Sequence, residues 1–123
     1  FFPGIVMALV DARRNAVYAQ AFSQGKSVIE PANRSVQEVL EWCARLGRQC
    51  LFVGDGAFSY RDLITEAVSQ AVFPPESLGL LRPSAAAGLG YARLLQGQGD
   101  PLFSLNPIYM RKTEAEIRWQ EQN

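Results

Sequence analysis

The sequence predicts an α/β fold in which helices pack on a mixed β-sheet. Two observations predict this class. Three strand-like segments follow one another at the start of the chain, joined by short polar turns, and after residue 35 helical and strand-like segments alternate. The 123 residues, 48% of them hydrophobic and 20% charged, suffice for a single domain with its own core, which we expect to span 1–123.

The first predicted elements form an antiparallel arrangement. Residues 5–10 are an unbroken apolar run, as expected of a strand buried on both faces. The polar connection 11–15 separates them from a second β-forming run at 16–22, so the two are expected to pair as a hairpin. A second turn signal at 23–26 leads to a short third strand at 27–30.

The next segment predicts a helix, a strand and a second helix. Residues 35–38, Ser-Val-Gln-Glu, form a capping box, and Gly47 is a natural stop for the helix that the box begins. A strand at 50–53 follows, and a further helix is expected from about Ser59. Residues 71–73 suit either another short strand or a continuation of that helix.

A third helix is expected from Pro83 to Leu95, closed by Gly97, with a carboxy-terminal tail over 98–123. The resulting order, β-β-β-α-β-α-β-α plus a tail, resembles one lobe of the actin-like ATPase (ribonuclease H-like) superfold. In that superfold two such lobes clasp a nucleotide. Element order alone bears on the fold and says little about function.

Composition excludes several classes of function. Twelve basic residues balance twelve acidic ones, whereas a surface that holds a polyanion normally carries a basic excess, so direct nucleic-acid binding is not expected. The sequence contains no histidine, which removes Ser-His-Asp and Cys-His nucleophile systems and histidine-based zinc sites. Two cysteines are too few for a closed structural zinc site, so no metal is expected.

The opening segment and the cysteines indicate a cytoplasmic protein. The residues after Phe1 have neither a charged flank nor a long apolar run, so neither a signal peptide nor a membrane span is expected. Because it starts abruptly in an apolar strand, the chain looks cut from a longer protein. Cys43 and Cys50 form no C-x-x-C motif and are expected to be buried and reduced, with a disulfide between them the less favoured alternative.

The candidate cofactor site is the strand-to-helix turn Gly54, Asp55 and Gly56. Glycines there would let the backbone approach a nucleotide closely, and the start of a helix favours an anion. The structural interpretation, in which the glycines only let the chain turn sharply, is favoured because short Gly-x-Gly turns are common and a phosphate-loop ending is absent. Asp11 follows a buried strand and suits catalysis, but it could equally pair with Arg13 or bind turn amides, and this structural role is preferred.

Two further features suggest contacts with other surfaces. Small residues make the third helix slim and permit close packing, by default on the domain's own sheet, otherwise on a partner; they are Ala85, Ala86, Ala87, Gly88 and Gly90. The mixed-charge tail carries Tyr109 and Trp119, which a purely solvated tail would not need, so the tail is expected to dock on this domain, a missing half or another protein.

Three motifs, in order along the chain, resemble those of one family. Residues 11–18 resemble its Asp-Ala-Arg-x-x-x-Val-Tyr hairpin, and 53–56 resemble its strand-end glycine turn. Residues 107–116 resemble its Pro-x-Tyr-Leu-Arg-x-x-x-Ala-Glu ending, with Met110 in place of Leu. The family is that of the bacterial tRNA threonylcarbamoyladenosine biosynthesis protein TsaB, also called YeaZ and described as glycoprotease-like.

The resemblance implies an actin-like protein of two lobes, of which this chain is the carboxy-terminal one and the amino-terminal lobe is absent. It implies a non-catalytic accessory protein that works with TsaD and TsaE to attach threonylcarbamoyl to adenosine in certain tRNAs. No cofactor is expected in this lobe, while ATP in the assembled complex and a homodimer are left open. The family-motif residues carried over are Asp11, Arg13, Tyr18, Pro107, Tyr109 and Arg111.

Two rival interpretations stand beside this one. The first is half of an ATP-using enzyme of the actin-like or sugar-kinase superfold, for which Gly54, Asp55 and Gly56 would form the nucleotide turn. The second is a glycopeptide-cleaving metalloprotease, which the absence of histidine from the sequence argues against.

Overall fold

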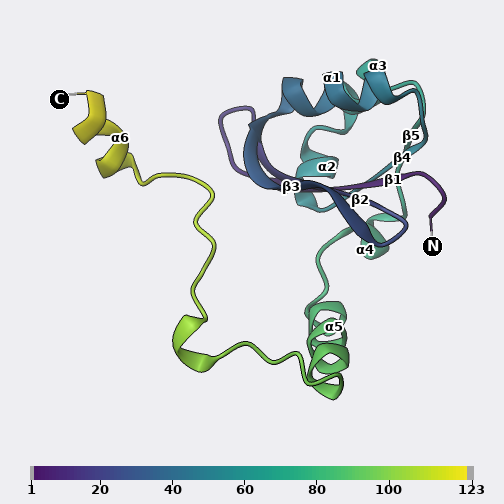
Figure 1. Ribbon diagram of the computed structural model, residues 1–123. Coiled ribbons are helices and arrows are strands. Elements are labelled where there is room, and N and C mark those ends of the chain that lie inside the picture. The colour runs from purple at the N-terminus through teal and green to yellow at the C-terminus, as the bar shows by residue number, and fades with distance from the viewer. Residues whose placement is uncertain (1, 122–123) are drawn as a thin grey trace. The chain divides into compact units, whose positions relative to one another are not determined.

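The computed structural model describes residues 2–121, apart from the side chain of Glu114. The chain forms two compact units, Phe1–Leu80 and Leu81–Asn123 (Figure 1). The sequence predicted one domain over 1–123 with a tail from residue 98, whereas the compact units divide after Leu80. The first unit contains the β-sheet, and the described elements of the second are all helical.

The first unit is built on a five-stranded sheet with the strand order β3-β2-β1-β4-β5. Its strands are β1 (Ile5–Asp11), β2 (Ala16–Ser23), β3 (Lys26–Ser35), β4 (Cys50–Val53) and β5 (Ala71–Val72). β2 is antiparallel to both β1 and β3, whereas β4 is parallel to both β1 and β5. The predicted α/β class, with a mixed sheet and helices, is therefore confirmed.

The antiparallel half of the sheet forms as predicted, with one difference of length. β1 pairs over its whole length with residues 17–23 of β2 as a hairpin. β3 extends to Ser35 and is not limited to 27–30, because its pairing with β2 continues to Ala16 opposite Ser35. Pro31 fits within this strand because β3 lies at the sheet edge, where a missing N–H group breaks no ladder.

Helix α1 (Val36–Leu46) has both predicted ends. The Ser35 hydroxyl accepts the N–H of Glu38 at 3.2 Å, and the Glu38 carboxylate accepts the N–H of Ser35 at 2.9 Å. Gly47 ends the helix in the left-handed conformation, with φ of 57°. α1 and α3 (Arg61–Ala67) lie side by side on one face of the sheet (Figure 1).

The second helix, predicted from about Ser59, is α3, which begins at Arg61, and the sequence did not predict the short helix before it. A short helix, α2 (Asp55–Ser59), begins after Gly54, the residue that follows β4, and the Asp55 carboxylate accepts the N–H of Gly56 at 2.8 Å. The chain then bends at Tyr60, where φ is −110° and ψ is 21°, before α3 begins.

The end of the first unit resolves one alternative that the sequence left open. Ala71–Val72 form strand β5 and do not continue the helix. A one-turn helix, α4 (Glu76–Gly79), follows, and the Gly79 carbonyl oxygen accepts the N–H of Gly54 at 2.6 Å. This hydrogen bond joins the end of the unit to the turn after β4.

The core of the first unit lies between one face of the sheet and the helices. Alternate residues of β1, β2 and β4 are buried on this face, as a strand period of two requires. The largest fully buried side chains are Phe52, Met7, Leu9, Ile64, Val17, Cys43 and Cys50. Both cysteines are free thiols, as the favoured interpretation expected. The hydrogen bond to Cys50 and burial raise the pKa of the Cys43 thiol, which therefore stays protonated.

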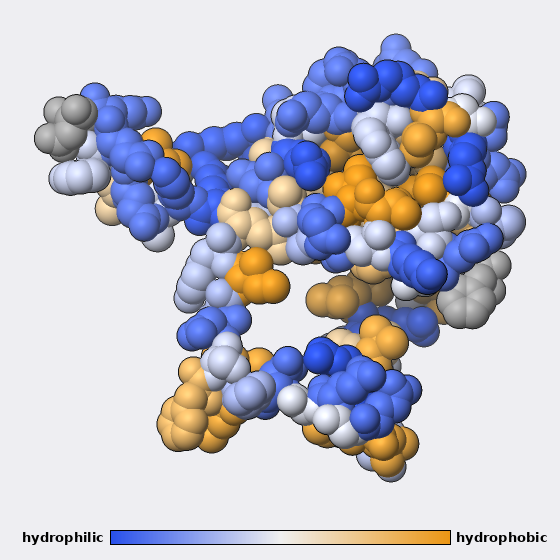
Figure 2. Space-filling model, in the orientation of Figure 1, coloured by the Kyte–Doolittle hydropathy of each residue, from blue (hydrophilic) through white to orange (hydrophobic). Residues whose placement is uncertain are grey.

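The second unit contains α5 (Pro83–Leu95), the 3-10 helix η1 (Leu102–Ser104) and α6 (Glu114–Glu121). The predicted bounds of the third helix are confirmed. α5, which is described in full, has no buried residue within its own unit, and its packing on the sheet stays a prediction. Figure 2 shows apolar surface over α5 and η1, and Phe103 is 99% exposed.

The tail contains a helix start that the sequence analysis overlooked. The Thr113 hydroxyl accepts the N–H of Glu116 at 3.3 Å, and the Glu116 carboxylate accepts the N–H of Thr113 at 2.7 Å. This is a second capping box, and the Thr-x-x-Glu spacing was its signal in the sequence.

Among the described residues, no helix combines the length and apolar character that crossing a membrane requires.

Candidate functional site

The carboxyl ends of β1 and β4 bring together residues that are far apart in the sequence. Because these strands are parallel, with Ile5 opposite Cys50 and Ala8 opposite Val53, the residues that follow them lie side by side. They form what we call the strand-end cluster: Asp11, Arg13, Gly54, Asp55 and Gly56. Ligand sites of open α/β sheets occur at such strand ends, which makes the cluster the first candidate site.

Hydrogen bonds to main-chain amides occupy both carboxylates of the strand-end cluster. One oxygen of Asp55 accepts the N–H of Asp11 at 3.1 Å and the N–H of Gly56 at 2.8 Å. One oxygen of Asp11 accepts the N–H of Arg13 at 2.8 Å. The two carboxylates therefore shape the two turns and join them, as the structural interpretation of Asp11 expected.

The glycines of the cluster allow the two strand ends to touch. Gly54 has φ of 96°, and a Cβ atom built there would collide with the carbonyl oxygen of Leu9. A Cβ at Gly56 would lie 3.1 Å from the Leu9 carbonyl oxygen and 3.1 Å from the Asp11 nitrogen. The glycines thus serve packing within the unit, and nucleotide binding by this turn stays a prediction.

The hairpin loop beside the cluster has an unusual backbone. Arg13, Arg14 and Asn15 all have positive φ, at 65°, 51° and 58°. Each such residue costs about 1–2 kcal/mol, so other contacts must hold the loop. Ala16 donates its N–H to the Arg13 carbonyl oxygen at 3.0 Å, and Val36 at the start of α1 donates to the Asn15 carbonyl oxygen at 2.9 Å.

The remaining family-motif residues lie elsewhere. Tyr18 is on β2 opposite Val10, on the face of the sheet away from buried Val17 and Ala19. Pro107, Tyr109 and Arg111 belong to the segment between η1 and α6.

Tyr109 is 85% exposed and Trp119 is 67% exposed. Docking of the tail through these aromatic side chains therefore stays a prediction.

Within the described residues, no group of three or more histidine, cysteine, aspartate or glutamate side chains could hold a metal ion.

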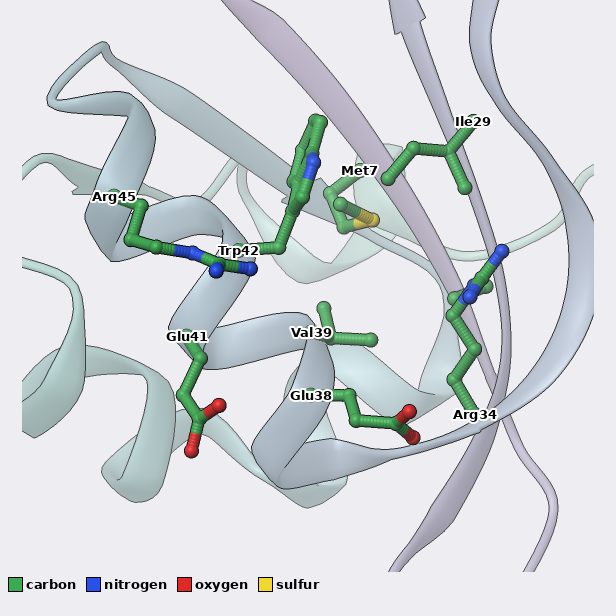
Figure 3. A pocket seen from close by; sticks show the side chains of 9 residues that line it. Met7, Ile29, Arg34, Glu38, Val39, Glu41, Trp42 and Arg45 are labelled. Carbon is green, nitrogen blue, oxygen red and sulfur yellow. The ribbon is translucent and has the colours of Figure 1, made fainter.

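A second candidate site, which the sequence analysis missed, is a cavity of about 320 Å³ between α1 and the sheet (Figure 3). We call it the α1 cavity. Its lining residues are Met7, Ala19, Ile29, Arg34, Glu38, Val39, Glu41, Trp42 and Arg45. The Nε atom of Arg34 is buried and has no hydrogen-bond partner among the described residues. Because the third strand was predicted to end at residue 30, the sequence did not place Arg34 on the sheet.

The sequence matches no family model. It is 26% identical over 129 aligned positions to the tRNA threonylcarbamoyladenosine biosynthesis protein TsaB of Bacillus subtilis (strain 168). The alignment covers 98% of this chain and 53% of the relative, so the chain spans about half the length of that protein. The likeness supports a TsaB-like relationship and extends over nearly the whole chain, as the three motifs do.

Proposed function

We propose that this chain is one lobe of an accessory protein in tRNA threonylcarbamoyladenosine biosynthesis, and that it contributes structure and contacts rather than catalytic groups. The observation that carries the proposal is the match to Bacillus subtilis TsaB along 98% of the chain. In this role the lobe works with TsaD-type and TsaE-type partners in the cytoplasm, an environment that suits its two free buried thiols.

The geometry of the strand-end cluster supports a non-catalytic role. Asp11 and Asp55 each use a carboxylate oxygen to accept main-chain N–H groups, which suits shaping of the turns better than proton transfer. The exposed aromatic side chains Tyr109 and Trp119 suit contact with a partner surface. The mixed sheet β3-β2-β1-β4-β5 is compatible with the further proposal that the chain is a lobe of an actin-like protein, and the three sequence motifs are the reason to propose the carboxy-terminal one.

The test is reconstitution of the modification. The full-length protein replaces TsaB in a reaction with TsaD, TsaE and the tRNA substrate, and modified adenosine is quantified by mass spectrometry. We expect modification that depends on the added protein. A folded protein that forms no complex with TsaD and supports no modification would refute the proposal.

A second candidate function is half of an ATP-using enzyme of the actin-like or sugar-kinase superfold. The position of Gly54, Asp55 and Gly56 at the carboxyl ends of parallel β1 and β4 favours it. Calorimetric titration of the chain with ATP and magnesium separates the two functions. The accessory role predicts no heat of binding, whereas micromolar affinity that a Gly56→Val substitution abolishes would support the enzyme.

A further inference from the structure

We propose that the α1 cavity is a binding site for a small organic acid that joins one carboxylate to an apolar body about the size of one ring. The proposal goes beyond the accessory role and is independent of it. It stands on the shape of β3, the apolar floor of the cavity and the distribution of charge around its walls.

A bulge in β3 places the cavity's cationic side chain on the core face of the sheet. Ala19 pairs with Ala32 and Ala21 pairs with Ile29, so β3 has one more residue than β2 between these pairs. Ile29 and Arg34 are five residues apart and would face opposite sides of a regular strand. The extra residue brings both to the face that α1 covers, where Arg34 lies opposite buried Val17.

The inner part of the cavity is apolar. Met7 and Ala19 are each 1% exposed and Val39 is 3% exposed. Ile29 and Trp42 are half-buried and pack against the core, so part of the wall above this floor is also apolar. Small-molecule sites combine such a lining with a few polar groups that orient the ligand, and about 320 Å³ lies at the lower end of their usual volumes.

Four charged side chains belong to the lining: the arginines Arg34 and Arg45 and the glutamates Glu38 and Glu41. Glu38 uses one carboxylate oxygen to accept both the N–H and the hydroxyl of Ser35, each at 2.9 Å. Glu41 accepts a hydrogen bond from Gln37 at 3.0 Å. The buried Nε of Arg34, by contrast, has no acceptor among the described residues, and Figure 3 shows its guanidinium beside Ile29.

A ligand carboxylate would add the acceptor that the Nε atom of Arg34 lacks among the described residues. It would accept from the Arg34 guanidinium, a pairing for which the planar geometry of arginine is suited. A phosphate dianion is disfavoured, because Glu38 and Glu41 already balance Arg34 and Arg45 in the lining, which leaves no excess positive charge for a second negative charge.

A competing explanation is that Arg34 protects the sheet edge. Inward-pointing charges on edge strands prevent edge-to-edge association, and β3 is an edge strand. The charge of Arg34 also acts on Glu38: the hydrogen bonds from Ser35 and then the nearby guanidinium hold the pKa of that carboxyl below its usual range. If Arg34 only protects the edge, its substitution should cause the chain to self-associate. The unaltered chain should then bind an acid and the matching amide equally well.

The experiment titrates the isotope-labelled chain with 3-phenylpropionate and, separately, with 3-phenylpropionamide, which has the same shape and no charge. Indole N–H resonances report the outcome, because Trp42 lines the cavity and Trp119, in the second unit, serves as the internal reference. We expect the acid to shift the Trp42 signal but not the Trp119 signal. The amide should bind about tenfold more weakly, since a hydrogen bond to a charged group is lost.

Variants identify the charge responsible. Arg34→Gln should clearly lower the acid-to-amide ratio although Arg45 remains in the lining, whereas Arg48→Gln, at an arginine outside the lining, should leave the ratio unchanged. Equal binding of acid and amide by the unaltered chain, or no shift of Trp42 with either, would overturn the proposal. The comparison of acid with amide needs no variant, so it decides the matter even if Arg34→Gln aggregates.

Discussion

Replacing Gly54 with alanine tests whether the strand-end glycines serve packing. Gly54 has φ of 96° and ψ of 164°, a backbone region open almost only to glycine. An alanine held in this conformation would cost about 1–3 kcal/mol. The new Cβ would also collide with the Leu9 carbonyl oxygen, so β1 and β4 must separate at their ends. That movement weakens the 2.6 Å hydrogen bond from Gly54 to Gly79, worth about 1 kcal/mol.

The summed effect is a loss of about 2–4 kcal/mol in the free energy of unfolding. For a unit of this size, that corresponds to a fall in melting temperature of roughly 8 °C or more. Thermal unfolding followed by circular dichroism, together with urea denaturation, measures both quantities.

Gly47→Ala is the matched control. Gly47 also has positive φ, at 57°, but a Cβ there would have no atom within 4 Å, so only the backbone term of about 1–2 kcal/mol applies. We expect Gly54→Ala to be clearly the more destabilising substitution. If the two are equal, the contact between the turn and Leu9 does not stabilise the protein and the packing argument is wrong.

Three further predictions concern single side chains. Asp55→Ala removes the acceptor of two main-chain N–H groups and should lower the free energy of unfolding in urea by about 1–2 kcal/mol; an unchanged midpoint would contradict the role given to this carboxylate. The hydrogen bonds from Ser35 lower the pKa of Glu38 from its ordinary value of 4.5, so its contribution to stability is present above that pH and is lost as pH falls through the folded value. On acidification below about pH 4.5, the melting temperature of the unaltered protein should therefore fall more steeply than that of Glu38→Gln. Identical pH profiles would show that the ionised Glu38 carboxylate does not contribute to stability. Cys43 and Cys50 are buried thiols and should react with a thiol reagent only on unfolding; fast labelling of the native chain would show that the core opens there.

Features that depend on neighbours in the sequence could be predicted from the sequence alone. The capping box of Ser35 and Glu38 and the glycine stop at Gly47 both form between residues a few positions apart, so local chemistry determines them. The hairpin of β1 and β2 could be predicted for the same reason, because a short polar connection holds the two β-forming runs close enough to pair. The overlooked Thr113–Glu116 box was equally readable.

Only the tertiary structure decided the contacts between distant segments. The sequence predicted a sharp turn at Gly54, but not that its Cβ position is filled by Leu9, which is 45 residues earlier and adjacent because β1 and β4 are parallel. In the same way, Arg34 faces the core only because pairing with β2 puts a bulge into β3. Strand register and bulges depend on the partner strand, so the hydrophobic periodicity of a single segment does not predict them.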